Sequence, residues 1–281
     1  MAVAPVCELY QRELDEAVAT LRRRGLISDQ NSRSTRSRIR SSRRQAEERS
    51  QSFIETMQET SHIRTPHKAV IEVLTWGAVL TFLSHIGSSF GSHVASPFLQ
   101  TIFDKSGAAI FAYIILPILT KMTIRRHKRR GIDDSTIRFM LLMSSLMQGV
   151  VSGYVIDSTY LSGEPLAFVT PLAIALAYAG EVKSVYTSRL SLLTACMATS
   201  LFANLAIGQL MDAVTKTYEI MAIIYSAAGM ATMQLVFKNV KKSGTGHYEQ
   251  FFLLQSFTYI RGLAFLICGY YRADLTYTRP W

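Results

Sequence analysis

Charged side chains inside long apolar runs are the residues of this sequence with the most potential for chemistry. A charged group within a membrane span is energetically costly and is therefore a functional candidate by default. Arg261 falls near the middle of an apolar run at 251–271 that contains no aspartate or glutamate. Its guanidinium needs a carboxylate, backbone carbonyl groups or a water-filled cavity. We expect it either to line a cavity or to act as a structural anchor.

Other polar residues in the apolar runs have simpler interpretations. Gln148 can hydrogen-bond between helices or line a pore, and bonding between helices is the simpler role. Glu72 and Glu219 lie near the starts of their runs, where a carboxylate reaches the headgroup region. The three cysteines lack metal-ligand spacing, and we expect no metal site and no cofactor.

Seven apolar runs position these residues. They occupy residues 69–89, 107–124, 137–156, 165–180, 189–211, 218–237 and 251–271. At about 1.5 Å per residue each can cross a hydrocarbon core of roughly 30 Å, although the fourth is short. Backbone in lipid must satisfy its hydrogen bonds internally, so the runs must be helices. The sequence therefore predicts an all-α integral membrane protein, a bundle of seven transmembrane helices.

The first 67 residues differ in composition from the rest of the chain. They are polar and rich in arginine and serine, so the overall hydrophobic content of 49% conceals two unlike parts. We predict a partly disordered cytosolic N-terminal segment at 1–67, and a membrane domain with a short C-terminal tail at 68–281. The net charge of +10 does not indicate nucleic-acid binding, because the basic residues are divided between that segment and short loops.

The basic residues alternate between loops as a seven-pass topology requires. The loops after the second, fourth and sixth runs are basic, whereas the intervening loops carry Lys105 and Lys216 alone. By the positive-inside rule, the N-terminus and the basic loops lie in the cytosol. The C-terminus then lies on the opposite side. If the polar seventh run is re-entrant instead, the C-terminus is cytosolic too.

A dense set of arginines is the candidate contact with the membrane surface or with a partner protein. Anionic lipid headgroups attract such clusters, and serine phosphorylation would weaken that attraction. A solvated tail is the simpler interpretation of the N-terminal part. The candidate contact residues are Arg36, Arg38, Arg40, Arg43, Arg44, Arg125 and Arg126.

Small residues mark the sides of the runs that face other helices. In the third run these include Ser145, Gly149 and Gly153. Small residues let helices approach closely in lipid, so they indicate packing rather than chemistry.

Several short motifs follow one another in a distinctive order. QGVVSG lies in the third run, EPLAF opens the fourth, SRLSLL opens the fifth, and ATMQLVF lies in the sixth with HY after it. In order and spacing they resemble the Bax inhibitor-1 (transmembrane Bax inhibitor motif) family over residues 66–267. The corresponding family motifs are E-G-x-x-x-G, D/N-P-S-I-L, R-R-x-Y-L-Y-L and D-T-Q-x-I-I with D-Y after it.

The resemblance implies a seven-helix fold and a pH-gated calcium leak, in which two membrane aspartates share a proton. The matching positions in this sequence are Thr232 and Thr258. Threonine hydroxyls do not titrate near neutral pH and offer calcium no charge, so the departure puts the calcium leak in doubt. Thr232, Thr258, Arg261 and Gln148 are the candidate pore or sensor positions.

Three functions are compatible with these features. The resemblance implies a regulator of cell death and intracellular calcium homeostasis that acts in the bilayer, through membrane-protein partners, without the di-aspartyl leak. The alternatives are an ion leak channel of altered selectivity and a structural subunit of a larger membrane complex. The sequence lacks the motifs of membrane enzymes, so we expect no catalysis. By resemblance, the protein resides in the endoplasmic reticulum or another endomembrane, with the mitochondrial inner membrane as the alternative.

Overall fold

The computed structural model describes residues 40, 43–45, 47–48, 50–51, 54–55, 67–181, 189–239 and 246–271. The chain divides into two units, Met1–Gln58 and Glu59–Trp281. In the first unit the described residues are helical and exposed, and the Arg43 side chain pairs with Glu47 one turn later at 3.2 Å. The second unit contains the apolar helices.

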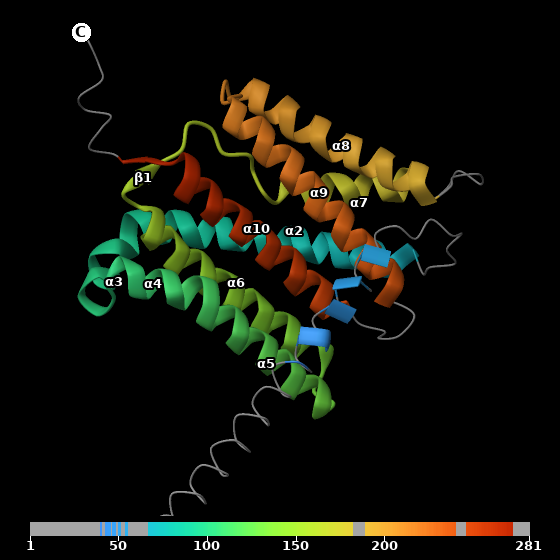
Figure 1. The fold of residues 1–281 in the computed structure, drawn as a ribbon, viewed down its shortest axis with the longest axis horizontal. Coiled ribbons are helices and arrows are strands. Elements are labelled where there is room, and N and C mark those ends of the chain that lie inside the picture. The colour runs from blue at the N-terminus through green and yellow to red at the C-terminus, as the bar shows by residue number, and fades with distance from the viewer. Residues whose placement is uncertain are drawn as a thin grey trace, which may run out of the picture. The chain divides into compact units, whose positions relative to one another are not determined.

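Six helical spans within the described residues are long and apolar enough to cross a membrane (Figure 1). Two are composite. The first joins α2 (His67–Phe90), the π-helical turn η1 (Gly91–Ala95) and α3 (Ser96–Ile102), and the second joins α4 (Lys105–Ile110), η2 (Phe111–Ile115) and α5 (Leu116–Arg129). The other four are α6 (Asp134–Ile156), α8 (Arg189–Leu210), α9 (Lys216–Asn239) and α10 (His247–Cys268).

The predicted fourth span, at 165–180, is a shorter helix, α7 (Val169–Glu181). Its 13 residues extend about 20 Å, less than the hydrocarbon thickness of roughly 30 Å. Pro165 disfavours helical backbone in the residue before it, and Gly163 has a φ of 85°, so the preceding backbone stays outside the helix. The all-helical prediction is thus confirmed, but a bundle of seven long helices is not what the structure contains.

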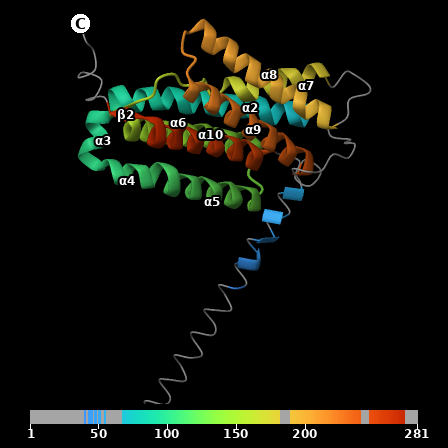
Figure 2. The same ribbon diagram turned by 45° about the horizontal axis from the view of Figure 1, so that its top comes forward.

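The helices alternate in direction between two ends of the bundle, with α4 and α5 on one side and α7 and α8 on the other (Figures 1 and 2). At one end, β1 (Thr159–Tyr160) pairs antiparallel with β2 (Tyr270–Tyr271), joining the end of α6 to the end of α10. The Thr215 hydroxyl donates to the Ser162 carbonyl at 2.7 Å, which brings the α8–α9 connection to the same place. We call this the strand end.

The opposite end carries most of the lysines and arginines that the structure describes in the second unit, and we call it the basic end. The α2 start meets the α7 end here, since His67 Nδ1 lies 3.0 Å from the Tyr178 hydroxyl. The lysines and arginines of this end that the structure describes are Lys68, Arg125, Arg126, Lys128, Arg129, Arg130, Arg138, Arg189 and Lys238. The helix ends that flank the loops predicted to share one side of the membrane therefore lie at one end of the bundle.

α2 and α6 pack with their backbones in direct contact at glycines. A Cβ added to Gly149 would lie 2.2 Å from the Ser84 carbonyl oxygen, and one on Gly153 would lie 2.1 Å from that of Ser88. Gly91, the residue directly after α2, approaches α6 in the same way. A Cβ added to it would lie 2.0 Å from a backbone carbonyl oxygen of α6. The prediction that Gly149 and Gly153 face another helix is confirmed.

Buried apolar side chains fill both sides of α2. One cluster joins it to α7, α8 and α9 through Leu74, Ile174, Leu193 and Met233. A second cluster joins it to α5, α6 and α10 through Leu80, Ile124, Leu141 and Leu254. α2 is therefore the central helix, and the polar residues described below lie beside it.

Candidate functional site

Arg261, the charged residue predicted within the last span, is paired with Glu164. Arg261 lies on α10 about 10 Å before its end, and Glu164 lies in the irregular segment between β1 and α7. The Nε atom is 2.5 Å from Oε1, and Nη2 donates to Oε2 at 3.1 Å. The two side chains are 17% and 15% exposed. The contact is a close ion pair supported by one hydrogen bond, so the Arg261 guanidinium has the carboxylate partner that a charged group in an apolar helix requires.

A small polar cavity lies beside this ion pair. It has a volume of about 20 Å³, and its lining includes Thr81, His85, Ser152, Thr258 and Arg261. A space of this size holds about one water molecule. The Arg261 guanidinium borders the cavity and also pairs with the Glu164 carboxylate.

Gln148 on α6 and Gln255 on α10 form a reciprocal amide pair. The Nε2 of each donates to the Oε1 of the other at 2.8 Å, and Gln148 Nε2 also donates to the Ala112 carbonyl at 3.3 Å. Both side chains are buried. Gln148 thus hydrogen-bonds between helices, and the pair ties α6 to α10 and η2. Each such bond in lipid contributes on the order of 0.5–2 kcal/mol.

Thr232 and Thr258 each bond to their own helix. The Thr232 hydroxyl donates to the Ala228 carbonyl, and the Thr258 hydroxyl donates to the Leu254 carbonyl, each at 2.9 Å. A hydrogen bond from a threonine hydroxyl to the backbone carbonyl four residues earlier is common within helices. Thr258 borders the small cavity, whereas Thr232 is fully buried on α9.

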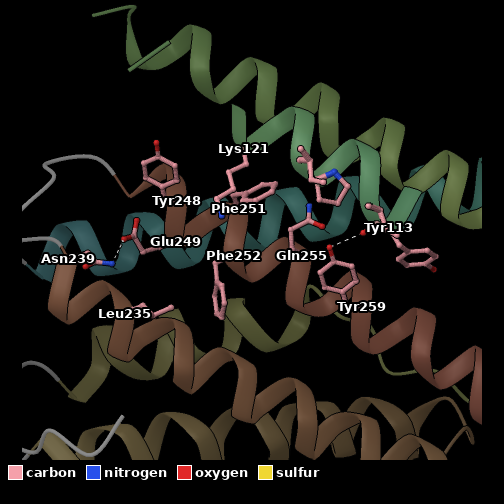
Figure 3. Close-up of a pocket in the computed structure, with 13 residues that line it drawn as sticks. Tyr113, Lys121, Leu235, Asn239, Tyr248, Glu249, Phe251, Phe252, Gln255 and Tyr259 are labelled. Atoms are coloured by element: carbon pink, nitrogen blue, oxygen red, sulfur yellow. Dashed lines mark hydrogen bonds between the residues drawn. The ribbon is translucent and has the colours of Figure 1, made fainter. Parts of the chain in front are cut away.

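An open groove of about 540 Å³ lies between α5 and α10, with α9 along part of its wall. Figure 3 shows the Tyr259 hydroxyl bonded to the Tyr113 carbonyl, and the Asn239 amide bonded to Glu249, both at 2.9 Å. Lys121 also lines the groove. Sequence reasoning missed this groove because its residues come from three helices that are far apart in the chain.

The predicted surface arginines are exposed wherever the structure describes them. These are Arg40, Arg43, Arg44, Arg125 and Arg126, while Arg36 and Arg38 lie outside the described residues. Arg125 and Arg126 join Arg129 and Arg130 around a shallow surface depression at the end of α5. Their contact with the membrane surface or a partner stays a prediction.

Two further residues of the polar interior were not singled out from the sequence as site residues. Glu164 had a signal, because it is the acidic residue of the EPLAF step that opens the fourth run. If the runs alternate in direction, that step and the second half of α10 lie toward the same end. Gln255 had a weaker signal, an amide inside an apolar run, of the kind that drew attention to Gln148.

Comparison with curated proteins and with solved structures finds no match. A family model described as Interactor of ZYG-11 matches residues 2–271, including the N-terminal segment. The interpretation as a Bax inhibitor-1 family member is therefore wrong, and the expected role in cell death and calcium homeostasis is withdrawn with it. The glycine motif behind that resemblance packs α6 against α2, a requirement that closely packed membrane helices share. The chain belongs to the Interactor of ZYG-11 family.

Proposed function

We propose that this protein is a membrane-embedded binding partner of a ZYG-11 protein, and that the partner docks at the basic end. The family's name supplies the class of partner. The observation that carries the location is the set of exposed arginines at the end of α5, Arg125, Arg126, Arg129 and Arg130. A surface of one charge sign selects a partner with an acidic surface and speeds its association. The proposed role is binding rather than catalysis.

The N-terminal segment carries further exposed arginines. The chain begins α2 at His67, at the basic end, so the preceding residues are covalently tethered there. Arg40, Arg43 and Arg44 in that segment are exposed. These three arginines are a second candidate contact for an acidic partner.

We place the basic end in the cytosol and count α7 as a seventh crossing. The segment 161–168 begins at the strand end, and α7 ends at the basic end. An extended segment of about eight residues adds up to roughly 25 Å to the roughly 20 Å of α7, enough to cross a hydrocarbon core. Non-helical backbone at membrane depth is tolerated where protein covers it, and Leu161 and Ala167 are buried.

The proposed topology applies to a protein in any cellular membrane and does not identify the compartment. The six long apolar helices support a multi-pass membrane protein. The expected endomembrane location rested on the family resemblance that the comparison overturns, so we propose membrane residence alone.

Neutralising the basic surface should weaken partner binding by roughly tenfold. The variant carries glutamine at Arg40, Arg43, Arg44, Arg125 and Arg126, which removes five charges while keeping long polar side chains. Exposed charge pairs contribute about 0.2–1 kcal/mol each, and 1.4 kcal/mol is a factor of ten. The measurement is the Kd between the full-length protein in detergent micelles and a purified ZYG-11 protein, at physiological salt.

A matched variant at the other end of the bundle provides the control. Lys105→Gln/Lys216→Gln removes charge at the strand end and should leave the Kd unchanged. Higher salt should weaken binding of the native protein more than that of the five-site variant. If the two variants bind equally well, the basic end is not the docking surface. If the native protein does not bind a ZYG-11 protein at all, the proposed function is wrong.

A further inference from the structure

The groove between α5 and α10 has the length of one leaflet of a bilayer. On α10 it extends from Tyr248 to Tyr259, which are eleven residues apart and therefore about 16 Å along the helix. The hydrocarbon core of a bilayer is roughly 30 Å thick, so one leaflet accounts for about half of that. At its deep end the groove is closed by the bond between the Tyr259 hydroxyl and the Tyr113 carbonyl (Figure 3).

The groove walls are suited to an acyl chain. They include Ile114, Pro117 and Ile118 on the η2–α5 side, Leu235 on α9, and Phe252 on α10. Ile114 and Ile118 are 54% and 52% exposed, and they belong to a helical span that is apolar enough to cross a membrane. Three polar side chains within the groove are already engaged, because Gln255 bonds to Gln148 and Glu249 accepts from Asn239. An apolar occupant therefore leaves no buried polar group of these pairs without its partner.

The shallow end of the groove carries the positive charge that a phosphate requires. Lys121 lines the groove and is exposed, and Arg125 follows one helical turn later on the same face of α5. Both lie on the half of α5 nearer the basic end. Lysine and arginine near a membrane surface attract lipid phosphates.

We propose that this groove binds one membrane phospholipid, with an acyl chain along α10 and the phosphate at Lys121 and Arg125. The site rests on the membrane-spanning character of α5 and α10, and it shares Arg125 with the proposed docking surface. The leaflet-length apolar channel selects an acyl chain, and the cationic mouth selects a phosphate-bearing headgroup over a neutral one. A bound lipid of this kind would fill the space that separates α5 from α9.

Native mass spectrometry of the full-length protein, purified in a mild detergent, tests this site. The unmodified protein should retain one phospholipid through repeated detergent washing. Ile118→Trp fills the groove, and Lys121→Gln removes one of the two cations proposed to hold the phosphate. Each should reduce the fraction of protein with bound phospholipid by roughly tenfold, the effect expected for loss of one charge-assisted contact or of the cavity itself.

Two variants outside the groove serve as matched controls. Leu176→Trp places the same bulk on an exposed apolar position of α7, and Lys216→Gln removes a lysine at the strand end. Both should retain the phospholipid at the native level. The proposal is overturned if the native protein retains a sterol, only detergent or nothing. Equal loss in groove and control variants also overturns it. If Ile118→Trp does not fold, the result for Lys121→Gln alone decides whether the groove binds a phospholipid. No partner protein is present in this experiment, so its result does not test the ZYG-11 proposal.

Discussion

Arg261→Met should lower the free energy of unfolding by about 3–5 kcal/mol, one of the two largest effects expected of a single substitution in this protein. Methionine fills a similar volume but leaves the Glu164 carboxylate, which is 15% exposed, without its cation. Glu164→Gln should destabilise by a similar amount, because the guanidinium then loses its counter-charge. The measurement is unfolding in mixed detergent micelles, with helix content followed as denaturing detergent is added.

The double variant distinguishes an ion pair from two separate side-chain effects. Glu164→Gln/Arg261→Met removes both charges and should recover a large part of the lost stability, since the cost of each single change is mainly one uncompensated charge. Glu47→Gln is the matched control in an exposed pair, where Arg43 and Glu47 are 81% and 60% exposed, and it should change stability by less than about 1 kcal/mol. Additive losses in the double variant would show that the pair is not the stabilising unit.

Gly153→Ala is the second substitution with a large expected effect, a loss of about 1–3 kcal/mol. The added methyl group would lie 2.1 Å from the Ser88 carbonyl oxygen, and backbone cannot move aside as a flexible side chain can. α2 and α6 must therefore separate, and α2 is the central helix of both core clusters. Gly149→Ala should behave similarly, because its Cβ would lie 2.2 Å from the Ser84 carbonyl oxygen.

Gly180→Ala supplies the matched control for these glycines. Gly180 is also helical, on α7, but a Cβ there meets nothing within 4 Å. Alanine has the higher helix propensity, so this variant should be neutral or more stable by up to about 1 kcal/mol. Thermal unfolding of all three variants in the same detergent gives the comparison. Equal stability of Gly153→Ala and Gly180→Ala would contradict the close backbone contact between α2 and α6.

The helices were predictable from the sequence because a bilayer imposes one simple requirement on length and polarity. Six of the seven apolar runs became long helices for that reason. The exception, α7, follows from local chemistry at Gly163 and Pro165, which a hydropathy pattern averages away. The predicted boundary at residue 67 between the polar segment and the membrane domain stays a prediction.

The polar site was only half predictable, because a single chain shows which residues need partners but not where the partners lie. Arg261 and Gln148 were identified by their cost within an apolar run. Their partners, Glu164 and Gln255, are 97 and 107 residues away in the chain. The positions compared with membrane aspartates, Thr232 and Thr258, were singled out by resemblance alone, and each bonds within its own helix.

The mistaken family resemblance has a physical origin. Its motifs include glycines, a proline and small polar residues at the starts and contact faces of membrane helices. Packing in lipid demands such residues at similar spacings in unrelated bundles. Gly149 and Gly153 illustrate this, because they serve the contact with α2. Residues 2–65, which that resemblance left out, lie within the family match that replaced it.

Cysteine labelling from each side of sealed vesicles tests the proposed topology most directly. In a background with the three native cysteines replaced, single cysteines are placed at Tyr160, before α7, and at Glu181, its last residue. Arg126→Cys and Lys105→Cys mark the basic end and the strand end. If α7 crosses the membrane, a membrane-impermeant maleimide labels Glu181→Cys from the same side as Arg126→Cys, and Tyr160→Cys from the same side as Lys105→Cys. Labelling of Tyr160→Cys and Glu181→Cys from one and the same side would contradict the seventh crossing and, with it, the gathering of the basic loops on the cytosolic face.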